Sequence, residues 1–192
     1  MKALLIDHDD SFTHNLKHWL SPIFDEVQVL NHAELTATTD HQVLEQNFKL
    51  FVLSPGPKSP CDYPQSLNLL RKINSTTPVF GVCLGFQMMA AVSGVSVSTY
   101  SPPLHGKCSR LKVIDLEFQR FQNLKVARYH SLKVDLSTVK DFNLVANSDD
   151  DLTSMWALHR LKKWAGVQFH PESFLTERSD LHLEVLQQWL NQ

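Results

Sequence analysis

The stretch Pro78-Val79-Phe80-Gly81-Val82-Cys83-Leu84-Gly85-Phe86-Gln87 combines an apolar strand, a sharp turn and the start of a helix around one cysteine. In a Gly-x-Cys-x-Gly sequence at such a junction, the glycines relieve the crowding of a strained turn, so the sulfur projects from the sheet. The helix expected over Leu84 to Ser93 directs its unpaired N–H groups and positive dipole end toward that sulfur, which favours thiolate over thiol. Cys83 is therefore either a nucleophile or a buried structural cysteine, and the choice depends on finding a partner base.

Around this stretch, apolar strand-like runs alternate with amphipathic helical runs, a pattern typical of β-α units that build a mainly parallel sheet. The first-half strands are expected at Ala3 to Asp7, Glu26 to Leu30, Leu50 to Ser54 and Pro78 to Val82. One helix is expected after Asp9 or Asp10, with Phe12, Leu16, Trp19 and Leu20 buried, and another from His41 to Asn47. A third opens at Pro64 and turns Leu67, Leu70 and Ile73 inward.

The second half changes to short strands with short connections, which favours antiparallel pairs added to the sheet. These strands are expected at Ser109 to Asp115, Val126 to His130, Leu144 to Ala146, Ser154 to His159 and Gly166 to His170. A last helix, Leu181 to Leu190, carries Leu183, Leu186 and Leu190 on one side. The expected fold is an α/β protein with an open, mainly parallel twisted sheet, helices on both faces and an added antiparallel part. Because no repeat or linker interrupts the chain, residues 1–192 are expected to form a single domain.

Composition excludes several classes of protein. The chain has 192 residues, a net charge of −2 and no basic run, so it lacks the Lys/Arg face that nucleic acids require. The three cysteines form no paired framework, which predicts a reducing cytoplasm and no structural zinc site. No window reaches 18 apolar residues and the N-terminal apolar run is too short for a signal peptide, so no membrane is expected.

A candidate base for Cys83 lies in Gly166-Val167-Gln168-Phe169-His170-Pro171-Glu172-Ser173. Residues i and i+2 of an extended chain point to the same side, and Pro171 favours an extended conformation at His170. Glu172 would then accept the second N–H of the imidazole and fix its tautomer, which completes a Cys-His-acid arrangement for nucleophilic catalysis. Alone, the segment would be read as a solvated turn.

The loop Leu53-Ser54-Pro55-Gly56-Pro57-Lys58-Ser59-Pro60 follows the third strand, near the cysteine in a doubly wound sheet. Gly56 lies between two prolines, which have no N–H, and its own N–H could point at a developing oxyanion beside that of Leu84. The alternative is an ordinary loop rich in proline and glycine.

Six motifs follow one another along the chain. They are Asp7-His8-Asp9-Asp10-Ser11-Phe12-Thr13-His14-Asn15-Leu16, Ser54-Pro55-Gly56-Pro57, the stretch from Gly81 to Gln87, His105-Gly106-Lys107, Arg128-Tyr129-His130-Ser131-Leu132 and the segment from Gly166 to Ser173. Together, in this order, they resemble the class I, or triad, glutamine amidotransferases. The first and fifth are most similar to the small subunits of anthranilate synthase and aminodeoxychorismate synthase. The resemblance implies a flavodoxin-like fold.

The resemblance also implies roles. Cys83 would be the nucleophile, His170 the general base and then acid, and Glu172 the orienting carboxylate, with Gly56 and Leu84 supplying oxyanion N–H groups. Gln87 and the backbones of Ser131 and Leu132 would hold the two α groups of glutamine. Asp10, Ser11 and Phe12 would lie at the face used by a chorismate-binding synthase subunit, which consumes the ammonia. No cofactor or metal is implied in this chain, whereas the synthase partner would be expected to use Mg²⁺.

The sequence departs from the family pattern at several positions. Lys58 stands where many relatives have glycine, and Phe86 where a histidine is usual. His8-Asp9 replaces a usual Asn-Tyr, and the glycine usual near the start of the last helix is missing around Arg178-Ser179. We expect activity to survive the change at Lys58, and the changes at His8-Asp9 and Arg178-Ser179 to touch partner surfaces more than the triad.

Two other functions stay open on the sequence alone. A thiol hydrolase that acts without a partner, such as a γ-glutamyl peptidase or a DJ-1-like protein, would share the cysteine at the turn. A non-catalytic regulatory subunit is the other alternative. A metal site is less favoured, because His14 and His18 are four residues apart on a helix but have no obvious third ligand.

Overall fold

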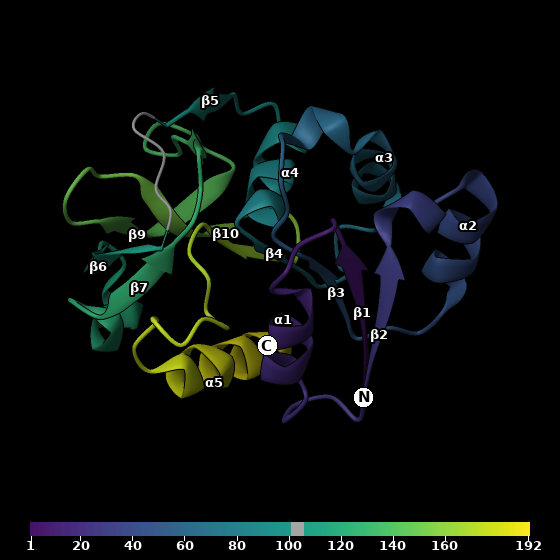
Figure 1. Cartoon of the computed structure of the whole chain (residues 1–192), viewed down its shortest axis with the longest axis horizontal. Coiled ribbons are helices and arrows are strands. Elements are labelled where there is room, and N and C mark those ends of the chain that lie inside the picture. The colour runs from purple at the N-terminus through teal and green to yellow at the C-terminus, as the bar shows by residue number, and fades with distance from the viewer. Residues whose placement is uncertain (101–105) are drawn as a thin grey trace.

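The computed structural model describes residues 1–100 and 106–192, so His105 of the fourth motif lies outside the described residues. Among these residues, nine strands form one sheet in the order β2-β1-β3-β4-β11-β10-β9-β6-β7 (Figure 1). The parallel part contains β2 (Glu26–Asn31), β1 (Lys2–Asp7), β3 (Leu50–Leu53), β4 (Val79–Val82) and β11 (Trp164–Val167). The antiparallel part continues with β10 (Ser154–His159), β9 (Phe142–Ser148), β6 (Lys107–Val113) and β7 (Lys125–Arg128). The expected parallel sheet with an antiparallel extension is confirmed.

Helices cover both faces of the sheet, as expected. The helices α1 (Thr13–Leu20) and α5 (Ser179–Leu190) pack on one face, whereas α2 (Ala37–Glu45), α3 (Pro64–Lys72) and α4 (Leu84–Val92) pack on the other. In β1, Ala3 and Leu5 join the first core, and Leu4 and Ile6 join the second. Successive side chains of a strand point to opposite faces, so a fully apolar strand serves two cores at once.

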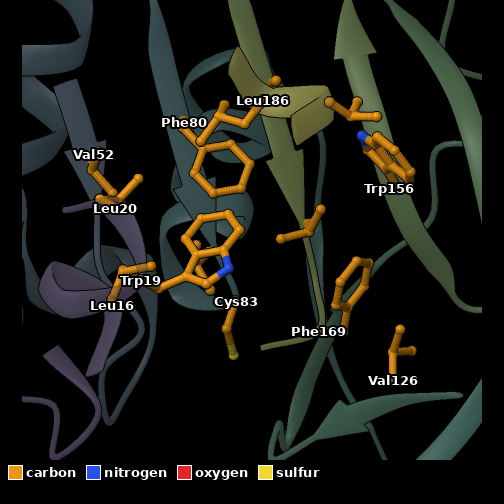
Figure 2. Close-up of a cluster of buried hydrophobic side chains, with 14 of the residues drawn as sticks. Leu16, Trp19, Leu20, Val52, Phe80, Cys83, Val126, Trp156, Phe169 and Leu186 are labelled. Atoms are coloured by element: carbon orange, nitrogen blue, oxygen red, sulfur yellow. The ribbon is translucent and has the colours of Figure 1, made fainter. Parts of the chain in front are cut away.

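The core under α1 and α5 reaches the cysteine at the turn. Figure 2 shows the ring of Trp19 close to Phe80 and Cys83 at the edge of the cluster, with its sulfur directed away from Phe80. The predicted apolar face of the first helix is confirmed for Leu16, Trp19 and Leu20, which are buried. It is wrong for Phe12, which precedes the helix and is only half-buried. This core anchors the end of β4, from which the site is built.

The face predicted for the last helix is only partly correct. Leu186 is buried as expected, but Leu183 and Leu190 are only half-buried. The core instead receives Leu181, His182 and Val185, so the buried stripe includes a histidine. A stripe defined by leucines alone could not reveal this position.

Several short elements were not predicted. They are η1 (His32–Glu34), η2 (Pro60–Asp62), η3 (Leu116–Phe121), and the strands β5 (Val97–Thr99) and β8 (Leu132–Val134), which pair in a second, two-stranded sheet. The helix expected from His41 begins earlier, at Ala37, because the side chain of Thr36 caps it. The small sheet packs against α4 and brings residue 132 toward it.

The strand expected at Gly166 to His170 is the main correction. The observed strand is β11 (Trp164–Val167), and it runs parallel to β4, with Gly166 opposite Gly81 and Val167 opposite Val82. Beyond Val167 the chain changes neighbours, since the N–H of His170 donates to the carbonyl of Ala127 at 3.1 Å. The remaining second-half strands are confirmed with small shifts at their ends. Among the described residues, none of the helices has the length and apolar character needed to span a membrane.

Candidate active site

The cysteine at the turn adopts a strained backbone. Cys83 has φ +52° and ψ −101°, a conformation that L-residues rarely adopt. Its N–H donates to the carbonyl of Val167 at 2.8 Å, which ties the turn to the neighbouring strand. A Cβ on Gly85 would lie 2.3 Å from the carbonyl oxygen of Leu53, and one on Gly81 would lie 2.6 Å from the carbonyl carbon of Gly85. The two glycines are therefore needed for close packing, and the strand-turn-helix expected around Cys83 is confirmed.

A cleft of about 290 Å³ opens beside Cys83. Six of the residues predicted for the site line it, namely Gly56, Cys83, Leu84, Gln87, Ser131 and Leu132. They come from the loop after β3, the start of α4 and the segment that leads into β8. The structure thus brings together residues that are far apart in the sequence, in a space suited to a small substrate.

His170 and Glu172 lie together as expected, although by a different route. Nδ1 of His170 lies 2.7 Å from Oε1 of Glu172, and both side chains are buried. The chain around Pro171 is a turn rather than an extended segment, because the N–H of Ser173 donates to the carbonyl of His170 at 3.2 Å. Proline is favoured at the second position of such a turn, so the sequence signal was correct but its geometric interpretation was wrong.

The charge state of His170 depends on its two neighbours. Burial, the largest influence, lowers the pKa of His170, but the Glu172 carboxylate and the Cys83 side chain outweigh it and raise this pKa well above its ordinary value. Nε2 of His170 is buried and has no hydrogen-bond partner among the described atoms. The rings of Tyr129 and Phe12 pack against the imidazole, with centroids 4.9 and 5.6 Å away. Nε2 is therefore the nitrogen left available for chemistry beside the sulfur.

The two candidate oxyanion donors lie next to each other. Leu84 is the first residue of α4, where an N–H has no acceptor within the helix. A Cβ on Gly56 would lie 2.8 Å from the side chain of Leu84 and 2.7 Å from both Cβ and the carbonyl oxygen of His8. Only glycine fits at this position, which lets the backbone of the loop approach the start of the helix.

The side chain of Gln87 is held by neighbours inside the protein. Its Nε2 donates to the carbonyl of Leu132 and to Oε1 of Gln168, both at 3.1 Å. Nε2 of Gln168 lies 3.5 Å from the sulfur of Cys83. Gln168 was not predicted as a site residue, and its only sequence signal was its place two residues before His170.

A buried ion-pair network supports the segment at Ser131 and Leu132. Arg128 pairs with Asp151 at 2.8 Å and donates from Nε to Nε2 of His130 at 3.1 Å. His130 therefore carries its proton on Nδ1, which donates to the carbonyl of Leu132 at 2.9 Å. Burial and the charge of Arg128 lower the pKa of His130 to about 4, so the ring stays neutral.

Two of the residues predicted for the partner face, Asp10 and Phe12, lie near His170. Oδ1 of Asp10 accepts the N–H of Phe12 at 2.8 Å, and Ser11 is exposed. Burial raises the pKa of Asp10, which is close enough to His170 and Glu172 to feel both charges. A partner seated on this surface would therefore lie close to His170 and Glu172.

The two histidines considered as a metal pair, His14 and His18, are both exposed. In the part of the chain that the structure describes, no group of three His, Cys, Asp or Glu side chains is arranged to hold a metal ion.

Comparison with known proteins identifies the family. Residues 4–186 match the family Glutamine amidotransferase class-I, and the chain belongs to that family. It is 36% identical over 191 residues to anthranilate synthase component 2, pyocyanine specific, of Pseudomonas aeruginosa, covering 98% of this chain and 94% of that protein. It is 38% identical over 178 residues to aminodeoxychorismate synthase component 2 of Klebsiella aerogenes, covering 91% and 93%.

A solved structure supports the fold. The chain is similar to a glutamine amidotransferase of Thermotoga maritima, with a TM-score of 0.69 and 20% identity, covering 99% of this chain and 94% of that one. At this level of identity the likeness concerns the fold alone. The flavodoxin-like, class I amidotransferase fold expected from the motifs is confirmed.

Proposed function

We propose that this chain hydrolyses the side-chain amide of L-glutamine and delivers the ammonia to a chorismate-using synthase subunit. One observation carries the proposal: Cys83, on a strained turn, opens into a cleft lined by Gly56, Leu84 and Gln87, beside the buried pair of His170 and Glu172. This is the arrangement of an activated cysteine nucleophile with an oriented base.

In this mechanism the sulfur of Cys83 attacks the amide carbon of glutamine, and the N–H groups of Leu84 and Gly56 donate to the oxyanion. Nε2 of His170, which has taken the proton of the Cys83 thiol, gives it to the departing nitrogen as the C–N bond breaks, so that ammonia leaves and a glutamyl thioester remains. The same nitrogen then takes a proton from water as the water attacks the thioester, and it returns a proton to the sulfur as the C–S bond breaks, so that glutamate leaves and the thiol is regenerated. Removal of one oxyanion donor typically lowers the rate by about 10²–10³-fold.

A synthase partner follows from the chemistry of ammonia, which is a nucleophile only while unprotonated and would be lost in bulk water. Relatives of similar length are named for two different synthases. We propose that the partner decides the product, either anthranilate, for tryptophan, or 4-amino-4-deoxychorismate, for folate. A reducing cytoplasm suits this function, since Cys61, Cys83 and Cys108 are free thiols.

The decisive experiment reconstitutes the chain with the large subunit of each synthase. Cys83→Ala should abolish glutamine-dependent product formation and leave ammonium-dependent formation intact, whereas Cys61→Ala, at an exposed thiol, should change neither. Glutaminase activity should rise when the correct large subunit is added, which separates this function from a lone thiol hydrolase. Glutamine-dependent activity in Cys83→Ala would overturn the proposal.

A further inference from the structure

His8 is a buried histidine that the reaction above does not use. Its side chain is fully buried where β1 ends, beside the loop that carries Gly56. The N–H of His8 donates to Oγ of Ser54 at 2.9 Å, and its Nδ1 lies 3.1 Å from the same oxygen. Its Nε2 lies 3.0 Å from Oγ of Ser66 in α3. One imidazole thus joins the start of the loop to a helix.

The hydrogen bonds define a single tautomer. Oγ of Ser54 donates its hydrogen to the carbonyl of Pro55 at 2.6 Å, so it can only accept from His8. Nδ1 of His8 therefore carries the proton, and Nε2 accepts from the hydroxyl of Ser66. Burial, with a smaller contribution from the stacked ring of His32, lowers the pKa of His8 to about 3. A neutral ring with both nitrogens bonded is a rigid support.

His8 also packs directly against Gly56. A Cβ added to Gly56 would lie 2.7 Å from both Cβ and the carbonyl oxygen of His8, so the two backbones are in direct contact. The hydroxyl of Tyr63 lies 2.9 Å from the carbonyl of Pro57 and 3.3 Å from that of His8. Tyr63 therefore connects the loop to the backbone of His8. Gly56 is thus held between His8 and Leu84.

We propose that His8 is a positioning residue that sets the N–H of Gly56 at the oxyanion, and this inference rests on the proposed function. The expectation that the change at His8 touches partner surfaces is therefore wrong, because the ring is buried against the loop. Displacement of an oxyanion donor weakens only an interaction that forms in the transition state, so it lowers kcat with little effect on KM.

The test compares His8→Ala and His8→Asn in glutamine hydrolysis. For His8→Ala we expect kcat to fall on the order of 10–100-fold and KM to stay within about twofold. The side-chain amide of asparagine can still donate to Oγ of Ser54, so His8→Asn should recover part of kcat. Alkylation of Cys83 by iodoacetamide, followed by mass spectrometry of its peptide, should keep its rate, because displacement at a saturated carbon builds no oxyanion.

His159→Asn is the matched control, since His159 is partly buried and packs against Phe142 and Trp164, away from the loop. If His8→Ala does not fold, Ser54→Ala removes the hydroxyl that links the ring to the loop and should lower kcat in the same way. A wild-type kcat in folded His8→Ala, or an equal fall in turnover and alkylation, would overturn the inference. These outcomes would leave the proposed function intact, because that function is tested separately by Cys83→Ala.

Discussion

Nδ1 of His170 and Oε1 of Glu172 lie 2.7 Å apart in a site where both side chains are buried. This contact fixes which nitrogen of the imidazole faces the cysteine, because Nδ1 donates to the carboxylate and Nε2 is left free. The carboxylate also helps to raise the pKa of His170. Both the orientation and the pKa of the His170 imidazole therefore depend on Glu172.

We expect Glu172→Gln to lower kcat for glutamine hydrolysis by about 10²–10⁴-fold, because a neutral amide supports the imidazolium poorly and permits the wrong tautomer. Without the carboxylate the pKa of His170 should fall. Because an imidazolium stabilises the Cys83 thiolate, alkylation of Cys83 by iodoacetamide should then require a higher pH.

Glu177→Gln serves as the control for loss of a nearby carboxylate, since the side chain of Glu177 is only half-buried and pairs with Lys125 at 3.7 Å. It should leave both kcat and the alkylation profile unchanged. An alkylation profile in Glu172→Gln identical to wild type would contradict the assigned role of the carboxylate.

The ion pair between buried Arg128 and partly buried Asp151 is expected to matter for both stability and glutamine binding. Burial raises the pKa of Asp151, but hydrogen bonds from Ser148, Tyr100 and Arg128 outweigh this and lower it. Arg128→Met should reduce the free energy of unfolding by about 3 kcal/mol, because it leaves a partly buried carboxylate without its cation.

The same substitution frees His130, which then no longer holds the carbonyl of Leu132, so KM for glutamine should rise on the order of tenfold. Urea unfolding and steady-state kinetics measure the two effects. Arg110→Met is the control, because Arg110 is exposed and donates to the carbonyl of Asn123, and it should change stability by less than about 0.5 kcal/mol. A wild-type KM in Arg128→Met would exclude the support assigned to this network.

The sequence predicted the parallel strands well because buried strands on the inside of a sheet are continuous apolar runs bounded by turn residues. It also predicted Cys83, since glycines on both sides of one cysteine indicate close packing at a turn. It did not predict β5 and β8, because each strand has only three residues and is partly exposed. Their pairing places Val97 opposite Val134 and Thr99 opposite Leu132, which are distant in the sequence.

Site residues that lie close together in the sequence were predicted. Site residues that are brought together only by tertiary contacts were missed. Glu172 was found because it is two residues from His170, although a turn rather than an extended chain joins them. Gln168 and His8 were missed as site residues, because their relevance comes from neighbours such as Cys83 and Gly56. Polar side chains of this kind give no sequence signal until the fold buries them.

Lys58 occupies a backbone conformation that favours glycine. Its φ is +68°. Lys58→Gly should raise the free energy of unfolding by about 1 kcal/mol, because it removes the strain of a left-handed conformation. Lys58→Ala loses the ammonium group but keeps the strain, so its stability should equal that of wild type. Urea unfolding measures the free energy of unfolding of both variants and so distinguishes backbone strain from charge. An equal rise in the free energy of unfolding of both variants would contradict the role of strain.

His182 makes the stability of the fold depend on pH. The ring is buried in α5 among Phe121, Phe169 and Trp156, and its Nε2 has no hydrogen-bond partner among the described atoms. Burial lowers the pKa of His182 to about 3, from an ordinary value of 6.5. Between these values the unfolded chain binds a proton at His182 and the folded chain does not.

The unfolded state is therefore favoured as the pH falls from about 6.5 toward 3, by about 1.4 kcal/mol per pH unit from this residue alone, with no such loss above pH 6.5. His182→Phe replaces the ring with one that needs no proton, so its stability should fall less steeply by that amount. Urea unfolding at pH 7.5, 6.0, 5.0 and 4.5 measures the slopes, with His18→Phe, at an exposed position, as the control for losing one histidine. Parallel slopes for His182→Phe and wild type would show that His182 is protonated within the folded protein.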